Sequence, residues 1–313
     1  MSSHVRGTSG SLVSNAYEDA SHKASILVEA LPYILRFWRK VVVVKYGGNA
    51  LSDTVAGSST DALASFAQDV VLVRSVGMLP VVVHGGGPQI GDLMSRLGKV
   101  PEFRGGMRVT DAETLEIARM VLVGKVNREI VAAINVHGAL AVGLSGEDAN
   151  LMTAVRRGGD LGFVGDVELV DPSLIERLLA QDLVPVVATV AADAKGQAYN
   201  INADSVAGAL AVALRAERLV FLTDTDGVRT DRDDPSTLLR SVDAPRLDAL
   251  VESGAVADGM VPKVEACAGA VRSGVAGAHI LDGRVPHALL LELFTDEGVG
   301  TMVVDDSDEG SAP

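Results

Sequence analysis

Unbroken apolar runs recur along the chain, and segments with a helical spacing of apolar residues separate them. The runs are Val41–Val44, Val81–Val83, Val184–Val187, Leu219–Leu222 and Gly300–Val304. Short valine-rich runs without polar alternation are typical of strands that are buried on both faces, as in a parallel sheet. Because strands alternate with helices, the pattern predicts an α/β fold with an open, mainly parallel central sheet sandwiched by helices.

Two of the intervening helices have ends that the sequence marks. Asp61–Val76 places apolar side chains on one helical face, and Gly77 is suited to end that helix. Thr110 and Glu113 have the spacing of a capping box, in which side chains satisfy free N–H groups of the first turn. They predict a helix that runs to about Val123.

Length, charge and cysteine content limit the function classes. The 313 residues suggest two domains or two lobes on one sheet, with a boundary near residue 190. The single cysteine, Cys267, excludes a disulfide framework and a cysteine-built zinc site. The net charge of -14 argues against nucleic acid as a partner, because binding to phosphates requires a basic face.

Neither a membrane span nor a secretion signal is visible in the sequence. No run of about 18 apolar residues occurs, and the N-terminal segment lacks the apolar core of a secretory signal. We therefore expect a soluble cytoplasmic protein with no membrane partner. Residues 1–24 and 305–313 are expected to be disordered ends because of their polar composition.

Three predicted strands run into glycine-rich turns, with the sequences KYGGN at 45–49, HGGGP at 84–88 and TDTDG at 223–227. In an open parallel sheet, ligands bind beyond the carboxyl ends of strands, and glycine lets backbone N–H groups approach an anion closely. One such turn is also compatible with an ordinary tight turn, but two on neighbouring strands, one with Lys45, favour a phosphate site. The P-loop and dinucleotide fingerprints are absent, which disfavours P-loop NTPases and Rossmann dehydrogenases.

Two lysines and one acid are the candidates for chemistry near these turns. Lys45 follows four valines, and Lys263 lies in the first turn of a predicted helix, where its charge opposes the helix dipole. Both placements make sense if an anion lies in front of them; otherwise both are solvated surface lysines. Asp204 is either an N-cap or a first-turn acid of a helix, which needs no function, or it orients the two lysines. Asn200 and Asn202 either form a turn or present amide groups to a ligand.

These segments resemble the amino acid kinase family. The matching stretches, in family order between residues 25 and 304, are VVVVKYGGNAL, VVVHGGGPQI, RGGMRVTD, YNINADSVAGALA, LVFLTDTDGV and GMVPKVEAC. Within the family, RGGMRVTD and YNINAD resemble the members that act on N-acetyl-L-glutamate rather than on carbamate, aspartate or uridylate. The resemblance implies the amino acid kinase fold, with an acetylglutamate-binding lobe over 41–190 and an ATP-binding lobe over 191–304.

The implied reaction transfers the γ-phosphoryl group of ATP to the γ-carboxylate of N-acetyl-L-glutamate, which yields N-acetyl-L-glutamyl 5-phosphate and ADP in arginine biosynthesis. Mg²⁺ is the implied cofactor, and it is held mainly by phosphates and water, so no metal-ligating side chains are expected. The alternatives are a carbamate or aspartate kinase of the same family and a non-catalytic arginine-binding protein.

The resemblance also assigns roles to residues. Lys45 and Lys263 are implied to stabilise the transferring group, and Asp204 to hold both lysines. The implied acceptor-binding residues are Gly86, Gly87, Arg108, Asn200 and Asn202. The implied ATP-binding residues are Gly47, Gly48, Asp224, Gly227 and Lys263.

A helix is expected upstream of the first strand, over 25–40. Its apolar face consists of Leu27, Leu31, Leu35 and Trp38, and Pro32 should kink it. Such a face packs either on its own domain or on a partner subunit. The resemblance implies the second arrangement, in which kinked helices interlace the subunits of a homo-oligomer, either a dimer or a hexamer built from dimers.

A stretch near the C-terminus, over residues 279–300, resembles the arginine-binding signature of arginine-inhibited family members. It implies that Tyr33, His279, Glu292 and Gly298 form a site for L-arginine as a feedback inhibitor. In that site, Glu292 is expected to receive the guanidinium group through two hydrogen bonds.

Overall fold

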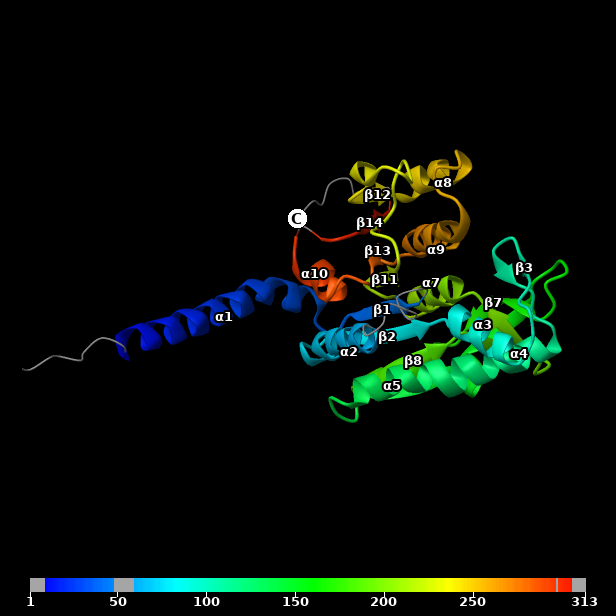
Figure 1. Cartoon of the computed structure of the whole chain (residues 1–313), viewed down its shortest axis with the longest axis horizontal. Coiled ribbons are helices and arrows are strands. Elements are labelled where there is room, and N and C mark those ends of the chain that lie inside the picture. The colour runs from blue at the N-terminus through cyan, green and yellow to red at the C-terminus, as the bar shows by residue number, and fades with distance from the viewer. Residues whose placement is uncertain (1–8, 48–58, 297, 306–313) are drawn as a thin grey trace, which may run out of the picture.

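The predicted strands form the centre of one eight-stranded sheet in the computed structural model, which describes residues 9–47, 59–296 and 298–305 (Figure 1). Across the sheet, the order of the strands is β12 (Ser241–Asp243), β14 (Thr301–Val304), β13 (Ala278–Asp282), β11 (Arg218–Thr223), β1 (Val41–Tyr46), β2 (Leu79–His84), β8 (Val184–Ala188) and β5 (Ala141–Ser145). Neighbouring strands are parallel, apart from the antiparallel pair β13 and β14. Each predicted apolar run overlaps one of these strands, so the predicted mainly parallel sheet is confirmed.

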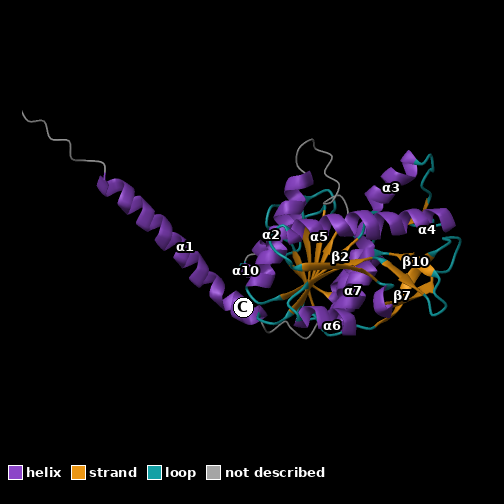
Figure 2. Cartoon of the chain, turned by 90° about the horizontal axis from the view of Figure 1, so that it is seen from below, coloured by secondary structure: helices purple, strands orange, loops and turns teal. Residues whose placement is uncertain are grey.

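Helices cover both faces of this sheet (Figure 1, Figure 2). The helices α2 (Ser59–Ser75) and α5 (Asn127–Asn135) lie on one face, and α7 (Ala203–Ala213) and α9 (Val261–Arg272) lie on the other. The other helical segments are α1 (Ser9–Phe37), α3 (Gly87–Arg96), α4 (Ala112–Arg119), η2 (Met120–Val126), η3 (Asp148–Asn150), α6 (Ser173–Ala180), η4 (Pro235–Thr237), α8 (Ala244–Glu252), η5 (Asp258–Met260) and α10 (Ala288–Phe294). The predicted layers, with helices on both sides of the sheet, are confirmed.

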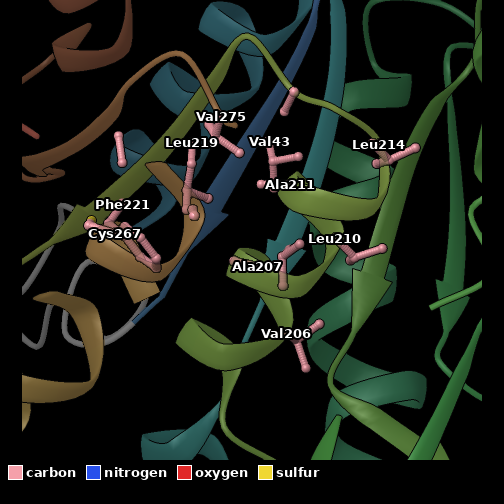
Figure 3. Close-up of a cluster of buried hydrophobic side chains, with 14 of the residues drawn as sticks. Val43, Val206, Ala207, Leu210, Ala211, Leu214, Leu219, Phe221, Cys267 and Val275 are labelled. Carbon is pink, nitrogen blue, oxygen red and sulfur yellow. The ribbon is translucent and has the colours of Figure 1, made fainter. Parts of the chain in front are cut away.

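Alternate residues of the central strand β1 point to opposite faces, and both faces are buried. Val43 belongs to an apolar cluster with Ala207 of α7 and Phe221 of β11, which Figure 3 shows. Val42 and Val44 belong to a second cluster, on the face that α2 and α5 cover. Because neither face meets water, valine suits every one of these positions, and this explains why the run lacks polar alternation.

A small closed barrel, which we did not predict, adjoins the sheet. Its strands are β10 (Ala198–Ile201), β7 (Val164–Val170), β6 (Met152–Arg156) and β9 (Val190–Ala192). The expected lobe boundary near residue 190 falls inside this barrel, so a division there would separate β6 and β7 from β9 and β10. A two-stranded hairpin is formed by β3 (Phe103–Arg104) and β4 (Met107–Arg108).

The helix predicted from Thr110 begins one residue later and is longer than expected. Asp111 is its N-cap, because the Oδ1 atom of Asp111 accepts a hydrogen bond of 2.8 Å from the N–H of Thr114. Thr110 instead donates its hydroxyl to the carbonyl of Arg108. The helix does not end near Val123: the chain continues through α4, the π-helical segment η2 and α5.

The N-terminal helix α1 begins at Ser9. Residues 9–24 are therefore helical, whereas their polar composition had predicted disorder. The helix projects away from the rest of the chain in both views (Figure 1, Figure 2), and α1 and α10 are in contact. Pro32 lies inside the helix, and the apolar side chains of Leu27, Leu35 and Trp38 are 70%, 65% and 56% exposed. The other expected disordered segments, residues 1–8 and 306–313, lie outside the described residues.

Among the described residues, no helix combines the length and the apolar character that crossing a bilayer requires.

Candidate active site

The strands β1, β2 and β11, each followed in the sequence by a glycine-rich segment, end at one edge of the sheet. Strand β1 is hydrogen-bonded to β2 on one side and to β11 on the other, and Lys45 of β1 lies opposite Val83 and Phe221. All three strands are parallel, so their carboxyl ends meet at this edge. Ligands bind at the corresponding edge of open α/β sheets.

Two lysines and one aspartate meet at this edge, and we call them the charged triad. The Nζ atom of Lys45 lies 2.9 Å from Oδ1 of Asp204, and Nζ of Lys263 lies 3.1 Å from Oδ2 of the same carboxylate. Lys45 and Asp204 are each only 5% exposed. The structure therefore brings together three candidate residues that are far apart in the sequence.

The N-cap of α7 shows how the Asp204 carboxylate comes to face the lysines. The Oδ1 atom of Asn202 accepts hydrogen bonds from the N–H groups of Asp204 at 2.7 Å and Ser205 at 3.3 Å. Asn202 is thus the cap, and Asp204 is a first-turn residue whose side chain is not used for capping. Of the two expected helix positions, Asp204 therefore takes the first turn and not the N-cap. The amide oxygen of Asn202 is committed to the backbone rather than to a ligand.

Lys263 occupies the first turn of α9, where its charge opposes the helix dipole. Besides its contact with Asp204, its Nζ donates a hydrogen bond of 3.1 Å to the carbonyl of Gly259. The carboxylate of Asp204 offsets the unfavourable interaction with the dipole, which explains why a lysine is tolerated at this position.

The triad carries a net positive charge in a nearly dry environment. Burial by itself raises the pKa of Asp204, but the charges of Lys45 and Lys263 outweigh burial and lower the pKa, so the carboxylate is ionised at neutral pH. One carboxylate shared by two ammonium groups leaves one positive charge in excess. Charges interact more strongly away from water, so this excess favours the binding of an anion.

Two cavities flank the triad. Lys45 and Asp204 line the smaller cavity, which has a volume of about 270 Å³. Lys263 lines the larger cavity, which has a volume of about 690 Å³. Because the three side chains are in contact, the triad lies where a ligand in one cavity would approach a ligand in the other.

The smaller cavity presents hydrogen-bond donors. Gly86 and Gly87 line it at the start of α3, where Gly86 is an N-cap without a side chain to satisfy the first-turn N–H groups. Arg108 donates from Nη2 to the carbonyl of Gly87 at 2.8 Å, and its guanidinium carbon lies 4.8 Å from the ring centroid of Phe103. Asn200 lines the same cavity. Such N–H and guanidinium groups suit a carboxylate ligand.

The larger cavity is lined by residues 223–229, which include the candidate residues Asp224 and Gly227. Gly227 has a φ of 145°, and a Cβ atom there would overlap Oγ1 of Thr301, so only glycine fits. Arg232 and Arg284, which were not expected at an ATP site, also line this cavity. Arg232 lies in no motif, and Arg284 lies in the stretch 279–300, whose resemblance pointed to arginine binding, so neither carried a signal for this cavity.

Gly47, the first glycine after β1, lies against Lys45. A Cβ atom at Gly47 would lie 3.1 Å from both Cε and Nζ of Lys45, so glycine leaves room for the ammonium group. Gly48, the other candidate in this turn, lies outside the described residues.

A second polar cluster joins the start of β13 to the end of α10. The Nδ1 atom of His279 lies 2.6 Å from Oε1 of Glu292. The other carboxylate oxygen accepts hydrogen bonds from the N–H groups of Val299 at 2.8 Å and Gly300 at 3.3 Å. Both oxygens of Glu292 are therefore engaged, and the expected two-bond contact with a guanidinium group is not available in this arrangement.

Gly298 lies directly beside this cluster. Its φ is 55°, and a Cβ atom there would lie 3.0 Å from Oε2 of Glu292. Burial lowers the pKa of His279 although Glu292 opposes the shift, and the Nε2 atom of His279 has no hydrogen-bond partner within the described ranges. Tyr33 is half-buried on α1, the helix that contacts α10.

Comparisons with known proteins agree with this architecture. The model of the amino acid kinase family matches residues 40–282. The chain is 50% identical to the acetylglutamate kinase of Moorella thermoacetica, over 90% of this chain and 97% of the relative. It is 52% identical to the acetylglutamate kinase of Symbiobacterium thermophilum, over 92% and 99% of the two chains.

Among solved structures, the chain is similar to N-acetylglutamate synthase from Neisseria gonorrhoeae complexed with coenzyme A and N-acetyl-glutamate. The TM-score is 0.79 at 26% identity, and the match covers 91% of this chain and 64% of the synthase chain.

His84 ends β2 and is buried next to the second glycine turn. Its Nδ1 lies 2.9 Å from the carbonyl oxygen of Gly85, and its Nε2 lies 3.1 Å from Nδ2 of Asn127 on α5. Burial lowers the pKa of His84 to about 4, although the contact with Gly85 opposes this shift. The imidazole is therefore neutral in the folded protein at neutral pH.

Folding stability should fall as the pH drops below 7 because of His84. The unfolded chain binds a proton on this imidazole near pH 6.5, whereas the folded chain binds it only near pH 4. Within that window protons favour the unfolded state, which costs about 2 kcal/mol of stability between pH 7 and pH 5. Urea unfolding of the wild type and of His84→Asn at both pH values measures this difference, since asparagine does not titrate. The same pH dependence in both proteins would contradict the prediction.

Proposed function

Because this chain belongs to the amino acid kinase family and has near-full-length relatives named acetylglutamate kinase, we propose that it phosphorylates N-acetyl-L-glutamate. The chain is an ATP-dependent kinase, and the proposed acceptor is the γ-carboxylate. The products are N-acetyl-L-glutamyl 5-phosphate and ADP, in a step of arginine biosynthesis. The observation that carries the proposal is the charged triad between two cavities.

The acceptor needs no general base. A carboxyl group with an ordinary pKa of about 4.3 is already ionised at neutral pH. One of its oxygens attacks the γ-phosphorus in line, while the bond from this phosphorus to the β–γ bridging oxygen breaks and ADP leaves with the electron pair. Asp204, whose pKa the two lysines lower, keeps its charge and positions them.

The two lysines serve the two sides of the transfer. Lys45 lies on the side of the smaller cavity, where the attacking carboxylate is proposed to bind. Lys263 lies on the side of the larger cavity, where ATP is proposed to bind. Their shared positive excess balances negative charge on the oxygens of the migrating group, and fixed charges of this kind are a major source of rate enhancement.

Arg108 is the residue proposed to recognise the other carboxylate of the acceptor. Its guanidinium group is held by the carbonyl of Gly87 and the ring of Phe103, so it is oriented before the ligand arrives. Asn200 and the backbone of Gly86 lie in the same cavity and are proposed to complete the acceptor site.

Mg²⁺ is proposed to accompany ATP. Within the described residues, no three histidine, cysteine, aspartate or glutamate side chains gather as a metal site. Asp224 and Asp226 line the larger cavity, and carboxylate oxygens fit an ion that phosphate and water otherwise hold. When bound, the ion neutralises charge on the β- and γ-phosphates.

Acceptor choice and triad variants test the reaction together. We expect ADP release with acetylglutamate and much less with glutamate, aspartate or carbamate. Lys45→Ala and Lys263→Ala should each lower kcat by about 100-fold or more, because each removes a fixed charge from the transferring group. Lys195→Ala, at an exposed loop position, is the matched control and should retain wild-type activity. A loss below tenfold for both triad variants would contradict the mechanism.

The arginine-binding function is proposed for the cluster of His279, Glu292, Gly298 and Tyr33. A neutral His279 donates its Nδ1 proton to Glu292, which leaves Nε2 as a buried acceptor for a guanidinium N–H. Strand β13 begins next to this cluster, and its last residue, Asp282, lines the larger cavity. L-arginine bound at the cluster would therefore lie at one end of β13, and the proposed ATP site lies at the other end. Allosteric inhibition requires two such distinct sites that are physically connected.

Millimolar L-arginine should lower the ATP-dependent activity of the wild type. Glu292→Gln removes the charge that attracts the guanidinium group, so half-inhibition should require about tenfold more arginine or higher. Glu252→Gln, at an exposed helical position, is the control and should respond as the wild type does. The ratio of initial rates with and without arginine is measured for each protein. Equal wild-type rates with and without arginine would refute the proposal.

Self-association through α1 is also proposed. The exposed apolar face of this projecting helix, which includes Leu27 and Leu35, needs a partner surface, and a second copy of the chain supplies one. We expect light scattering to give the mass of a dimer or a hexamer for the wild type. Leu27→Glu combined with Leu35→Glu should lower that mass, whereas His22→Glu, at an exposed position on the opposite side of the helix, should not. A monomeric wild type would exclude this role for α1.

A further inference from the structure

We propose that His84 and Asn127 are positioning residues that orient the Gly85–Gly86 peptide, so that the N–H of Gly86 is presented to the acceptor carboxylate. The proposal rests on the proposed function in one respect: the acceptor binds in the smaller cavity, which Gly86 lines. Four structural observations support it.

Hydrogen-bond chemistry fixes which ring nitrogen of His84 carries the proton. The carbonyl oxygen of Gly85 can only accept, so Nδ1 of His84, 2.9 Å away, must donate. A neutral imidazole has one N–H, so Nε2 must accept, and the atom 3.1 Å from it is the donor Nδ2 of Asn127. The two contacts therefore require the same tautomer. Both His84 and Asn127 are 0% exposed, so water does not compete for these contacts.

The amide of Asn127 is itself held in one orientation. Its Nδ2 also donates to the carbonyl of Val186 on β8 at 2.8 Å, and its Oδ1 accepts from Nη2 of Arg128. The carbonyl of Leu144 on β5 lies farther from Nδ2, at 3.3 Å, so the two N–H groups go to the two nearer acceptors, Val186 and His84. Turning the amide over would place its oxygen against the carbonyl oxygen of Val186 and its NH₂ group against the guanidinium. Asn127 is therefore a fixed support that the sheet and α5 provide for His84.

The contact with Gly85 determines the direction of the next N–H group. No cis peptide bond occurs in the described residues, and in a trans peptide the N–H of Gly86 points opposite to the carbonyl of Gly85. Because His84 binds that carbonyl, the N–H of Gly86 points away from His84. Gly85–Gly87 line the smaller cavity and His84 does not, so the contact turns this donor to the side of the cavity.

The π-helical segment η2, which directly precedes Asn127, packs against the glycine turn. A Cβ atom at Gly86 would lie 2.8 Å from Cδ2 of Leu122 and 3.3 Å from Cγ2 of Val126. These two residues belong to η2, and Asn127 is the residue that follows it. Single π-turns inside helices are frequent at functional sites. Here the register of η2 places Leu122 and Val126 against Gly86, and it places the amide of Asn127 against His84.

Two substitutions of His84 distinguish the roles of its two ring nitrogens. Asparagine places an amide nitrogen near the position of Nδ1, and glutamine places one near the position of Nε2. We expect His84→Asn to keep KM for acetylglutamate within about threefold of the wild type. His84→Gln and Asn127→Leu should raise this KM about tenfold, the cost of an imperfectly aligned hydrogen bond, without changing KM for ATP.

Asn135→Leu is the matched control. Asn135 is an asparagine at the other end of α5, and its side chain accepts from the N–H groups of Leu140 and Ala141. Its loss should lower Tm and leave both KM values unchanged. If His84→Gln and Asn127→Leu likewise lower Tm without raising KM for acetylglutamate, the network is only structural and the proposal is overturned. Equal KM increases in His84→Asn and His84→Gln would overturn it as well, because Nδ1 would then have no special role.

The ¹⁵N NMR spectrum of histidine-labelled wild type tests the tautomer without any variant. We expect His84 to show a protonated Nδ1 and an unprotonated Nε2 at pH 7. A charged ring or a proton on Nε2 would overturn the proposal. If the wild type fails to phosphorylate acetylglutamate, the proposed function is wrong. The role of His84 is then still decided by its tautomer and by the comparison of KM between the wild type and the His84 variants, measured with the carboxylate acceptor that the enzyme does use.

Discussion

A single buried carboxylate shared by two ammonium groups is the interaction on which the site depends. Without Asp204, the charges of Lys45 and Lys263 would repel each other in surroundings that screen them poorly. With Asp204 between them, the two ammonium groups lie near one point, with one positive charge in excess. An anion between the two cavities would complete the charge balance, and this is why we propose that the migrating phosphoryl group lies there.

The fold controls the geometry of this triad through the packing of α7 and α9. Lys45 belongs to β1, whereas Asp204 and Lys263 lie in the first turns of α7 and α9. These helices pack against each other: a Cβ atom at Gly208 of α7 would be in ordinary contact, at 3.4 Å, with Cβ of Ala266 on α9. Close helix packing therefore brings the two first turns, and with them the carboxylate and the ammonium group, within contact distance.

The central sheet was predictable because burial on both faces leaves a local signature, the valines of β1. The barrel was not, since strands as short as Val190–Ala192 carry no comparable pattern. Thr110 and Asp111 are both good caps, and only the folded geometry selects Asp111. At the site, the placement of Lys45 and Lys263 at element ends marked them as candidates. Asn127 had no such signal, because its role depends on the register of the preceding π-helical segment.

The proposed acceptor side of the site combines charged groups and oriented N–H donors, which have different physical requirements. The triad supplies charge, which acts over distance and depends weakly on orientation, whereas the glycine turn supplies N–H donors, whose strength depends on angle. The group that orients the turn must not disturb the charge balance. A protonated His84, on the strand next to Lys45, would add a further positive charge there. Burial keeps its pKa at about 4, so the imidazole orients the donors and leaves the field of the triad unchanged.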